Sequence, residues 1–252
     1  MASILKKEII EGLRTYKFLV ILFGVVLFAL LDPIILKLLP KILESQLAGA
    51  DLSELFTLDQ PSAALNYYKN LHQMGSIIVC FALMKIIAGE LKDKTAIIPY
   101  TNSLSFFKLV IAKFTVYASY LFTVVVFSTV LNYFYAGSLF SGQRFAFMGA
   151  VKSGLMFGLY FAFLVTCLMF FGSLFKKPNI AALCTVTLAL FLPAIGSLFK
   201  IARYLPSGLL DEARLLLPTV TTNGFTSLVI TIILCGSLLF LTIFRLKTID
   251  LS

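Results

Sequence analysis

Six long apolar stretches, separated by shorter polar segments, dominate the pattern of hydrophobic and polar positions along the chain. They cover roughly residues 17–39, 71–89, 109–135, 148–175, 180–199 and 225–244. A helix needs about 20 mainly apolar residues to cross the hydrocarbon core of a bilayer, and each stretch comes close to that length. The pattern predicts an all-α membrane protein with six transmembrane helices, forming one transmembrane domain over residues 1–252.

Two of the predicted spans have features of their own. The Asp32-Pro33 pair predicts a break in the first span, because proline removes a helix hydrogen bond and clashes with the preceding turn. The second apolar stretch is the shortest, so we expect it to be the inner end of a longer helix that starts near Ser62. That start would place Tyr67 and Tyr68 at the outer membrane interface, where aromatic side chains gather.

The composition excludes an ordinary soluble domain. The chain has 252 residues, of which 60% are hydrophobic and 13% charged, whereas soluble domains are about 45–50% apolar and about 25% charged. Its net charge of +9 fits attraction to anionic lipid, since the pattern offers no basic, aromatic-rich soluble surface for nucleic acid. Membrane lipid is therefore an expected partner, and nucleic acid is not.

The placement of Lys and Arg predicts the orientation. Six spans put both termini on one side of the membrane, and 13 of the 21 Lys and Arg residues fall on that side. Loops on the cytoplasmic side carry the excess of positive charge. Both termini are therefore predicted to be cytoplasmic. The location expected for this multi-pass protein is a bacterial or archaeal plasma membrane.

Residues 1–16 predict an amphipathic helix ahead of the first span. Leu5, Ile9 and Leu13 recur at helical spacing, and charged residues such as Lys6 and Arg14 fill the other side. Such a helix lies in the membrane interface. It is expected either to be an elbow helix that packs beside the bundle and moves with it, or to be a plain cytoplasmic anchor.

The inner segment over residues 90–108 combines charged and apolar side chains. It opens with Glu90, Lys92, Asp93 and Lys94, and an apolar patch follows, made of Ile97, Ile98, Leu104, Phe106 and Phe107. Apolar groups on the water side of a membrane protein often mark a contact site. The segment is expected to dock into a cytoplasmic partner or to lie on lipid as an interfacial helix, and the pattern does not decide between these alternatives.

Two further segments predict packing and capping. Gly154, Gly158 and Ala162 lie at four-residue spacing in the fourth span, so they form a smooth ridge that another helix can approach closely. That helix belongs either to the same subunit or to a second one. The outer connection, residues 200–224, is too polar to cross the membrane and too apolar to be free in water. It is expected to form re-entrant or interfacial helices, or else a structured loop without a gating role.

The chain lacks the groups that drive transport or catalysis. No G-x-x-x-x-G-K-[ST] motif is present to hold ATP phosphates. Only Asp32 and Lys85 are candidate ionisable groups inside the spans, both expected near the ends, and ion-coupled carriers usually need such groups. His72 is expected at the outer rim of the second span without a role, and the four cysteines act as small apolar residues. We expect no catalytic, cofactor-binding or metal-binding residue, and an energy source outside this chain.

The layout resembles the permease subunits of type-2 ABC exporters. In that family an interfacial elbow helix precedes six spans, and the loop between spans two and three begins with Glu, carries a Gly-Thr pair and a Pro, and leads to a Lys that opens span three. The matching positions are Glu90, Thr95, Pro99 and Lys113, while Lys94 departs from the Gly of the pair. The opening KKEIIEGLRTYKF, followed by DPIILKLLPKIL, also resembles the entry of these permeases.

The resemblance implies a partner and a division of labour. Two permease subunits, identical or homologous, would pair to enclose a path, and each would bind a cytoplasmic ATPase subunit that holds ATP and Mg²⁺ and carries out the hydrolysis. The chain itself would not be an enzyme. The residues implied in coupling to the ATPase are Glu90, Lys92, Thr95, Ile97, Ile98, Pro99, Phe106 and Phe107 in the inner loop, and Lys176 and Lys177 in the turn after the fourth span.

Two other classes of function stay open beside the exporter permease. An intramembrane enzyme would need His, Glu or Asp side chains that converge within the spans. An ion-coupled carrier or channel would transport without an ATPase partner. The cargo is not predicted by any motif in the chain.

Overall fold

The computed structural model of the chain describes residues 2–46, 59–93 and 106–248, and these residues contain helices and no strand. The helices, in chain order, are α1 (Ala2–Arg14), α2 (Lys17–Gln46), α3 (Gln60–Asn70), the π-helical turn η2 (Leu71–Gly75), α4 (Ser76–Leu83), α5 (Ala88–Lys92), α7 (Phe106–Leu139), α8 (Phe147–Phe175), α9 (Pro178–Leu198), the short 3₁₀ turn η3 (Ala202–Tyr204), α10 (Gly208–Arg214) and α11 (Thr222–Thr248).

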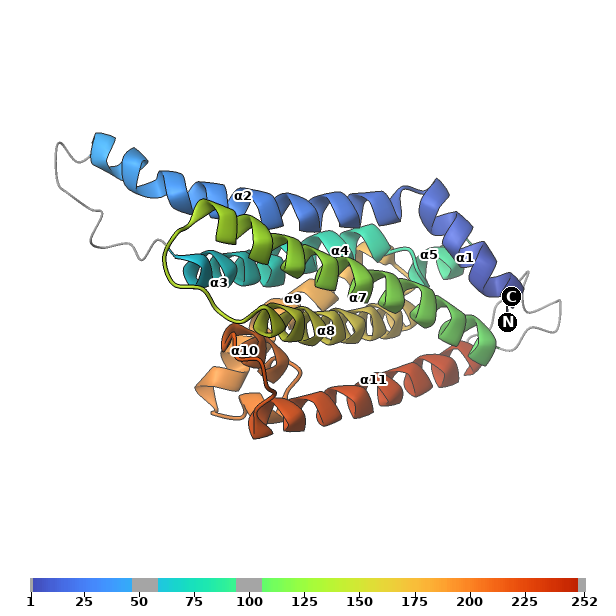
Figure 1. The fold of residues 1–252 in the computed structure, drawn as a ribbon. Coiled ribbons are helices and arrows are strands. Elements are labelled where there is room, and N and C mark those ends of the chain that lie inside the picture. The colour runs from blue at the N-terminus through green and yellow to red at the C-terminus, as the bar shows by residue number, and fades with distance from the viewer. Residues whose placement is uncertain (1, 47–58, 94–105, 249–252) are drawn as a thin grey trace.

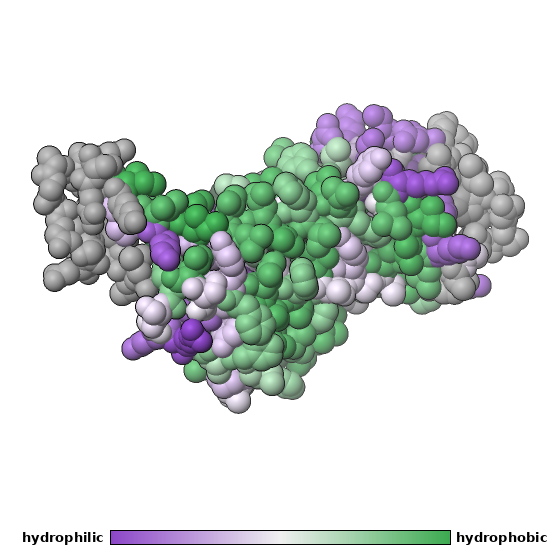
Figure 2. Space-filling view, turned by 45° about the horizontal axis from the view of Figure 1, so that its top comes forward, coloured by the Kyte–Doolittle hydropathy of each residue, from purple (hydrophilic) through white to green (hydrophobic). Residues whose placement is uncertain are grey.

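Six helical stretches are long and apolar enough to cross a membrane, which confirms the predicted number of spans. They are Lys17–Pro40, Gln60–Lys92, Phe106–Leu139, Phe147–Phe175, Pro178–Leu198 and Thr222–Thr248. A broad hydrophobic band covers the middle of the molecule, and hydrophilic side chains gather toward its ends (Figure 2). This distribution is the one that a lipid bilayer selects.

The second span begins close to its predicted start. Helix α3 begins at Gln60, where the side chain of the N-cap residue Asp59 accepts a hydrogen bond of 2.8 Å from the backbone N–H of Ser62. The position of the two tyrosines differs from the prediction. Tyr67 and Tyr68 are fully buried inside the bundle, and the Tyr67 hydroxyl lies 2.6 Å from the Ser128 hydroxyl of α7.

Helix α8 forms the centre of the bundle, with α7, α9, α10 and α11 packed around it (Figure 1). Helices α2 and α11 lie at opposite outer sides of the bundle. At one end, α1 and α5 lie near the start of α7 and the end of α11, and at the other end α10 covers the bundle (Figure 1). The two ends of the bundle therefore consist of different helices. A buried ion pair lies at each end, Lys113–Glu8 at one and Lys152–Glu212 at the other.

The glycine ridge of α8 packs within the chain. A Cβ atom at Gly154 would meet the side chain of Thr129 and the backbone of Val126, and a Cβ at Gly158 would meet the ring of Phe122. These neighbours all belong to α7, so the two glycines allow α7 and α8 to approach closely. Ala162, the third member of the ridge, is half-buried.

The predicted break at Asp32-Pro33 is wrong, because α2 continues through Pro33 and Pro40 to Gln46. Pro33 lacks an N–H, so the carbonyl of Ala29, four residues earlier, loses its helical donor. The side-chain amide of Asn132 on α7 donates a hydrogen bond of 2.9 Å to that carbonyl. A neighbouring helix thus replaces the missing bond, which allows a proline inside a span.

Helix α9 contains a second proline that is compensated in the same manner. Pro193 leaves the carbonyl of Ala189 without its helical donor. The Tyr160 hydroxyl of α8 donates to this carbonyl at 3.1 Å, and Nε2 of His72 also lies 3.1 Å from it. His72 is buried in the bundle at the π-helical turn, so its predicted place at the outer rim is wrong.

Candidate functional site

Three helices meet at one end of the bundle in a buried cluster of charges, which we call the junction: Glu8 of α1, Glu90 of α5 and Lys113 of α7. Nζ of Lys113 donates to both carboxylate oxygens of Glu8, at 2.9 and 3.0 Å, and to Oε1 of Glu90 at 2.9 Å. The side chains of Lys113 and Glu8 are 1% and 0% exposed. One ammonium group thus holds three separate elements together.

The sequence of α1 turns Glu8 toward the bundle. Ile4 and Glu8 share one face of the helix, and Ile4 packs against Leu109 and Ala112 of α7. Gly12 continues that face and leaves room for the ring of Phe18, which a Cβ would strike. The contact of Ile4 with α7 lies one helical turn from Glu8, so the Glu8 carboxylate also faces α7 and reaches Lys113.

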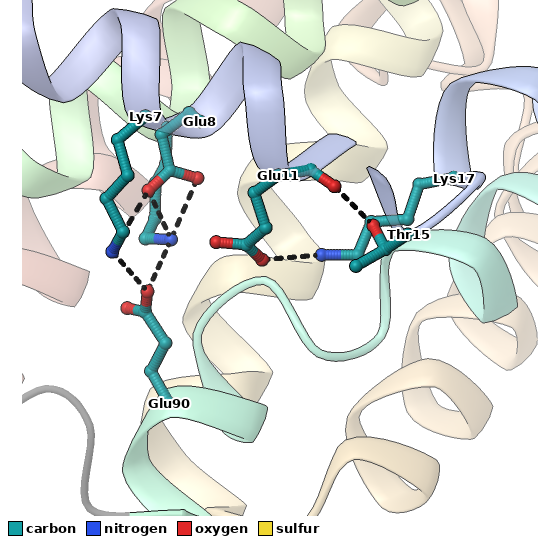
Figure 3. Close-up of polar contacts among 7 residues, drawn as sticks. Lys7, Glu8, Glu11, Thr15, Lys17 and Glu90 are labelled. Carbon is teal, nitrogen blue, oxygen red and sulfur yellow. Dashed lines mark hydrogen bonds and ion pairs between the residues drawn. The ribbon is translucent and has the colours of Figure 1, made fainter. Parts of the chain in front are cut away.

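A fourth charged group closes the junction toward the surface. Nζ of Lys7 lies 3.6 Å from Oε1 of Glu90 and 4.0 Å from Oε1 of Glu8, and its side chain is 53% exposed (Figure 3). The junction therefore pairs two carboxylates with two ammonium groups. One of these cations is buried and the other borders solvent, so the cluster as a whole is neutral.

A second ion pair holds the turn between α1 and α2. Nζ of Lys17 donates to Oε1 of Glu11 at 2.9 Å, and the Thr15 hydroxyl donates to the Glu11 backbone carbonyl at 2.6 Å (Figure 3). Tyr16 takes a left-handed conformation, with φ of 57°, which lets the chain change direction between the two helices. The angle between α1 and the first span is thus set by several local contacts.

The two glutamates of α1 are shifted in opposite directions. Burial raises the pKa of Glu8 above its ordinary value, and the attraction of Lys113 offsets only part of that effect. Burial also acts to raise the pKa of Glu11, but the hydrogen bond and charge of Lys17 outweigh it and lower the pKa. Burying charges is costly unless every partner is well placed, so the junction depends on its geometry.

The same carboxylates could in principle coordinate a metal ion. Glu8, Glu11 and Glu90 each bring an oxygen within 4.8 Å of the others. However, Lys113 and Lys7 already neutralise Glu8 and Glu90, and Lys17 neutralises Glu11. The ammonium groups supply the positive charge that a metal ion would bring, so the arrangement suits a contact that holds the helices together.

The residues implied in partner contact fall into three groups. Glu90 belongs to the junction, and Phe106 is buried against the core. The contact of these two residues with a partner stays a prediction. Phe107 is 56% exposed, and Lys92, Lys176 and Lys177 are exposed as well. Thr95, Ile97, Ile98 and Pro99 lie outside the described residues.

A second buried ion pair holds the opposite end of the bundle. Nζ of Lys152 on α8 donates to Oε1 of Glu212 on α10 at 2.9 Å, and both side chains are almost fully buried. Glu212 also accepts hydrogen bonds from the backbone N–H of Thr221, at 3.1 Å, and from its hydroxyl. The connection over residues 200–224 thus contains short helices that are fastened to the fourth span.

Sequence reasoning missed both buried ion pairs. It placed Lys113 at the opening of the third span, did not single out Lys152, and named Asp32 and Lys85 as the ionisable groups within the spans. Lys85 is exposed, whereas Asp32 is 2% exposed. One signal was available: Lys113 and Lys152 stand inside long apolar runs, where a lysine needs a partner.

Comparison of the chain with protein-family models, with curated proteins and with solved structures gives no match in any of the three.

Proposed function

We propose that the chain is the permease subunit of an ATP-driven ABC exporter, coupled to a separate cytoplasmic ATPase subunit through the segment between the second and third spans. The observation that carries this proposal is the junction. Glu90 stands at the start of that segment and Lys113 in the helix that follows it, and the Lys113 ammonium binds both Glu90 and Glu8 of the first helix. A force applied to the segment would reach α1 and α7 together.

The position of α1 supports its role as an interfacial elbow helix. Leu13 of α1 and Tyr16 just after the helix are 60% and 67% exposed, and Lys6 and Arg14 of α1 are exposed as well. An apolar groove between α1 and α7 is lined by Leu5, Ile9 and Leu13, among others. A helix with these faces binds at the level of lipid headgroups, and the excess of Lys and Arg at this end favours a cytoplasmic position for both termini.

The coupling mechanism follows from the ion pairs that join α1, α5 and α7. When ATP binding closes the partner ATPase, the docked segment is displaced, and the buried ammonium of Lys113 passes the displacement to α1 and to the third span. The ATP-bound state of the partner has to bind the segment differently from the nucleotide-free state, because otherwise no work is transferred. In the exporter, a second copy or a homologue of this subunit completes the path.

The first experiment is co-purification with the ATPase subunit that the proposal requires. We expect the chain to retain such a subunit, and Phe107→Glu to weaken the association at least tenfold while membrane insertion is unchanged. Phe199→Glu is the matched control, because Phe199 is 64% exposed but lies beyond the end of α9, at the opposite end of the bundle. Equal retention by both variants would remove the docking role of this segment.

The second experiment tests the energy source. The protein reconstituted alone in vesicles should show no transport, and addition of the ATPase subunit with ATP should start it. Rapid flux driven by an ion gradient alone would contradict the proposal and would favour an ion-coupled carrier.

A further inference from the structure

The first span carries a buried carboxyl group that the junction does not use. Asp32 of α2 is 2% exposed and faces α3, where the side-chain amide of Asn70 donates a hydrogen bond of 2.8 Å to its Oδ1. Its Oδ2 is buried and has no hydrogen-bond partner among the described residues. An ionised carboxylate with one donor and one unsatisfied oxygen is expensive in a bundle that lies in lipid.

Positive charge does not offset this cost within the described part of the chain. The ion pairs there involve Glu8, Glu11, Glu90, Asp211 and Glu212, and none reaches Asp32. Tyr67 of α3 interacts electrostatically with Asp32, and its hydroxyl is paired with Ser128. The sequence over residues 47–58, which follows α2, contains no Lys, Arg or His. No side chain that the structure describes therefore forms an ion pair with Asp32.

Buried acceptors without a partner also occur on α3 and α7, the two helices that hydrogen-bond to α2 through Asn70 and Asn132. Oδ1 of Asn132 on α7 and Oε1 of Gln60 on α3 are buried without a partner among the residues that the structure describes, as is Oδ2 of Asp32. The amide of Asn132 is already used on the Ala29 carbonyl, one turn before Asp32 on α2. A proton on Asp32 would turn one unsatisfied acceptor into a donor and would remove the buried charge at the same time.

We propose that Asp32 is a proton-binding site of the first span and that the packed bundle holds its carboxyl in the protonated, neutral form. The site lies next to Pro33, where α2 lacks one backbone hydrogen bond and depends on Asn132 instead. Loss of the proton places an unpaired charge at this weak point and loosens α2 from α3 and α7. The site stands whether or not an ATPase subunit binds the opposite end of the bundle.

Infrared spectroscopy of the purified protein in lipid nanodiscs tests the protonation state directly. At neutral pH the wild type should show the carbonyl stretch of a protonated carboxyl in a dry environment, and Asp32→Asn should lack that contribution. Asp211→Asn is the matched control, since Asp211 is 54% exposed and pairs with Arg214 at 3.6 Å, so the band should persist. An unchanged band in Asp32→Asn would overturn the proposal.

Thermal unfolding, followed by circular dichroism, gives an independent readout. Asn has the shape of protonated Asp, so Asp32→Asn should fold and should match the wild type in Tm near about pH 4, where the carboxyl is protonated in the unfolded chain as well. A carboxyl that is protonated in the folded state and ionised in the unfolded state costs stability as the pH rises above the unfolded pKa. The wild type should therefore lose Tm from about pH 4 toward neutral pH, and the variant should lose less. A Tm gain on adding sodium that Asp32→Asn abolishes would assign the site to a metal cation and would also overturn the proposal.

Discussion

Glu8 and Lys113 are 105 positions apart in the sequence, and their side chains share two hydrogen bonds of 2.9 and 3.0 Å in a place that solvent does not reach. The contact joins a helix outside the predicted spans to the beginning of the third span. Neither partner is stable there alone, because a buried charge without its counter-charge has no compensation. The pair therefore makes the position of α1 depend on that of α7.

We expect Lys113→Met to destabilise the protein by about 3–5 kcal/mol, which is the usual cost of removing one member of a buried ion pair. The variant leaves Glu8 and Glu90 facing each other without the buried ammonium. Unfolding followed by circular dichroism in detergent measures the effect. Lys108→Met is the control, because Lys108 is exposed on the same helix. A cost equal to that of the control would show that the junction does not stabilise α1.

The ion pair between Lys152 and Glu212, at the end of the bundle away from the junction, should contribute less stability in acid. Burial acts to raise the pKa of Glu212, but hydrogen bonds from Thr221 and Lys152 outweigh it and bring the pKa below the ordinary value of 4.5. A group whose pKa is lower in the folded state adds stability that is present above the unfolded value and is lost as the pH falls toward the folded value. We therefore expect Tm to decline below about pH 4.5.

Glu212→Gln tests the source of that decline. The variant should be less stable than the wild type at neutral pH, since Lys152 loses its buried counter-charge, and it should show a smaller decline of Tm in acid. Asp211→Asn, on the adjacent and half-exposed position, serves as the comparison. The same acid profile in the wild type and in Glu212→Gln would assign the decline to other carboxylates.

The polar contact at Pro193 should behave as a replacement for a backbone bond. Removing both donors in His72→Leu/Tyr160→Phe leaves the buried carbonyl of Ala189 unsatisfied, which we expect to cost about 1–3 kcal/mol. Pro193→Ala restores a backbone N–H at that position, so the double variant should lose less stability in this background. Equal losses in the two backgrounds would mean that His72 and Tyr160 stabilise the bundle by packing alone.

The close approach of α7 and α8 depends on the missing side chain of Gly154. We expect Gly154→Ala to destabilise the protein by about 1–3 kcal/mol, because the new methyl group meets Thr129 and the α7 backbone. Gly236→Ala is the matched control, since a Cβ there meets nothing within 4 Å, and it should be neutral or slightly stabilising. Equal effects at both positions would exclude a special role for the glycine ridge.

Much of the architecture was predictable because lipid imposes a simple rule. Every long apolar run has to satisfy its backbone hydrogen bonds internally, so the runs at residues 109–135 and 148–175 become α7 and α8 with small changes at their ends. The start of the second span near Ser62 was predictable for the same reason. The break at Asp32-Pro33 was predicted wrongly, because local pattern does not show that Asn132 lies opposite Ala29.

Only part of the candidate site could be predicted from the sequence. Glu90 and Lys113 stood out by resemblance to a loop pattern, and Glu8 did not, because nothing in the order of residues says which face of α1 meets α7. Phe106 and Phe107 are adjacent and chemically identical, yet one is buried and the other exposed. The two exposures differ because adjacent side chains on a helix point about 100° apart, so that only Phe106 meets the core.

The helical character of the chain, the number of helices that can cross a membrane and most of their ends follow from the length and polarity of local segments, so they can be predicted from the order of residues. The partners of Lys113, Lys152, His72 and Asp32 depend on how the helices pack. The reason is physical: burial turns a charge or a carbonyl from a solvated group into one that needs a specific partner, and that partner comes from a distant part of the chain.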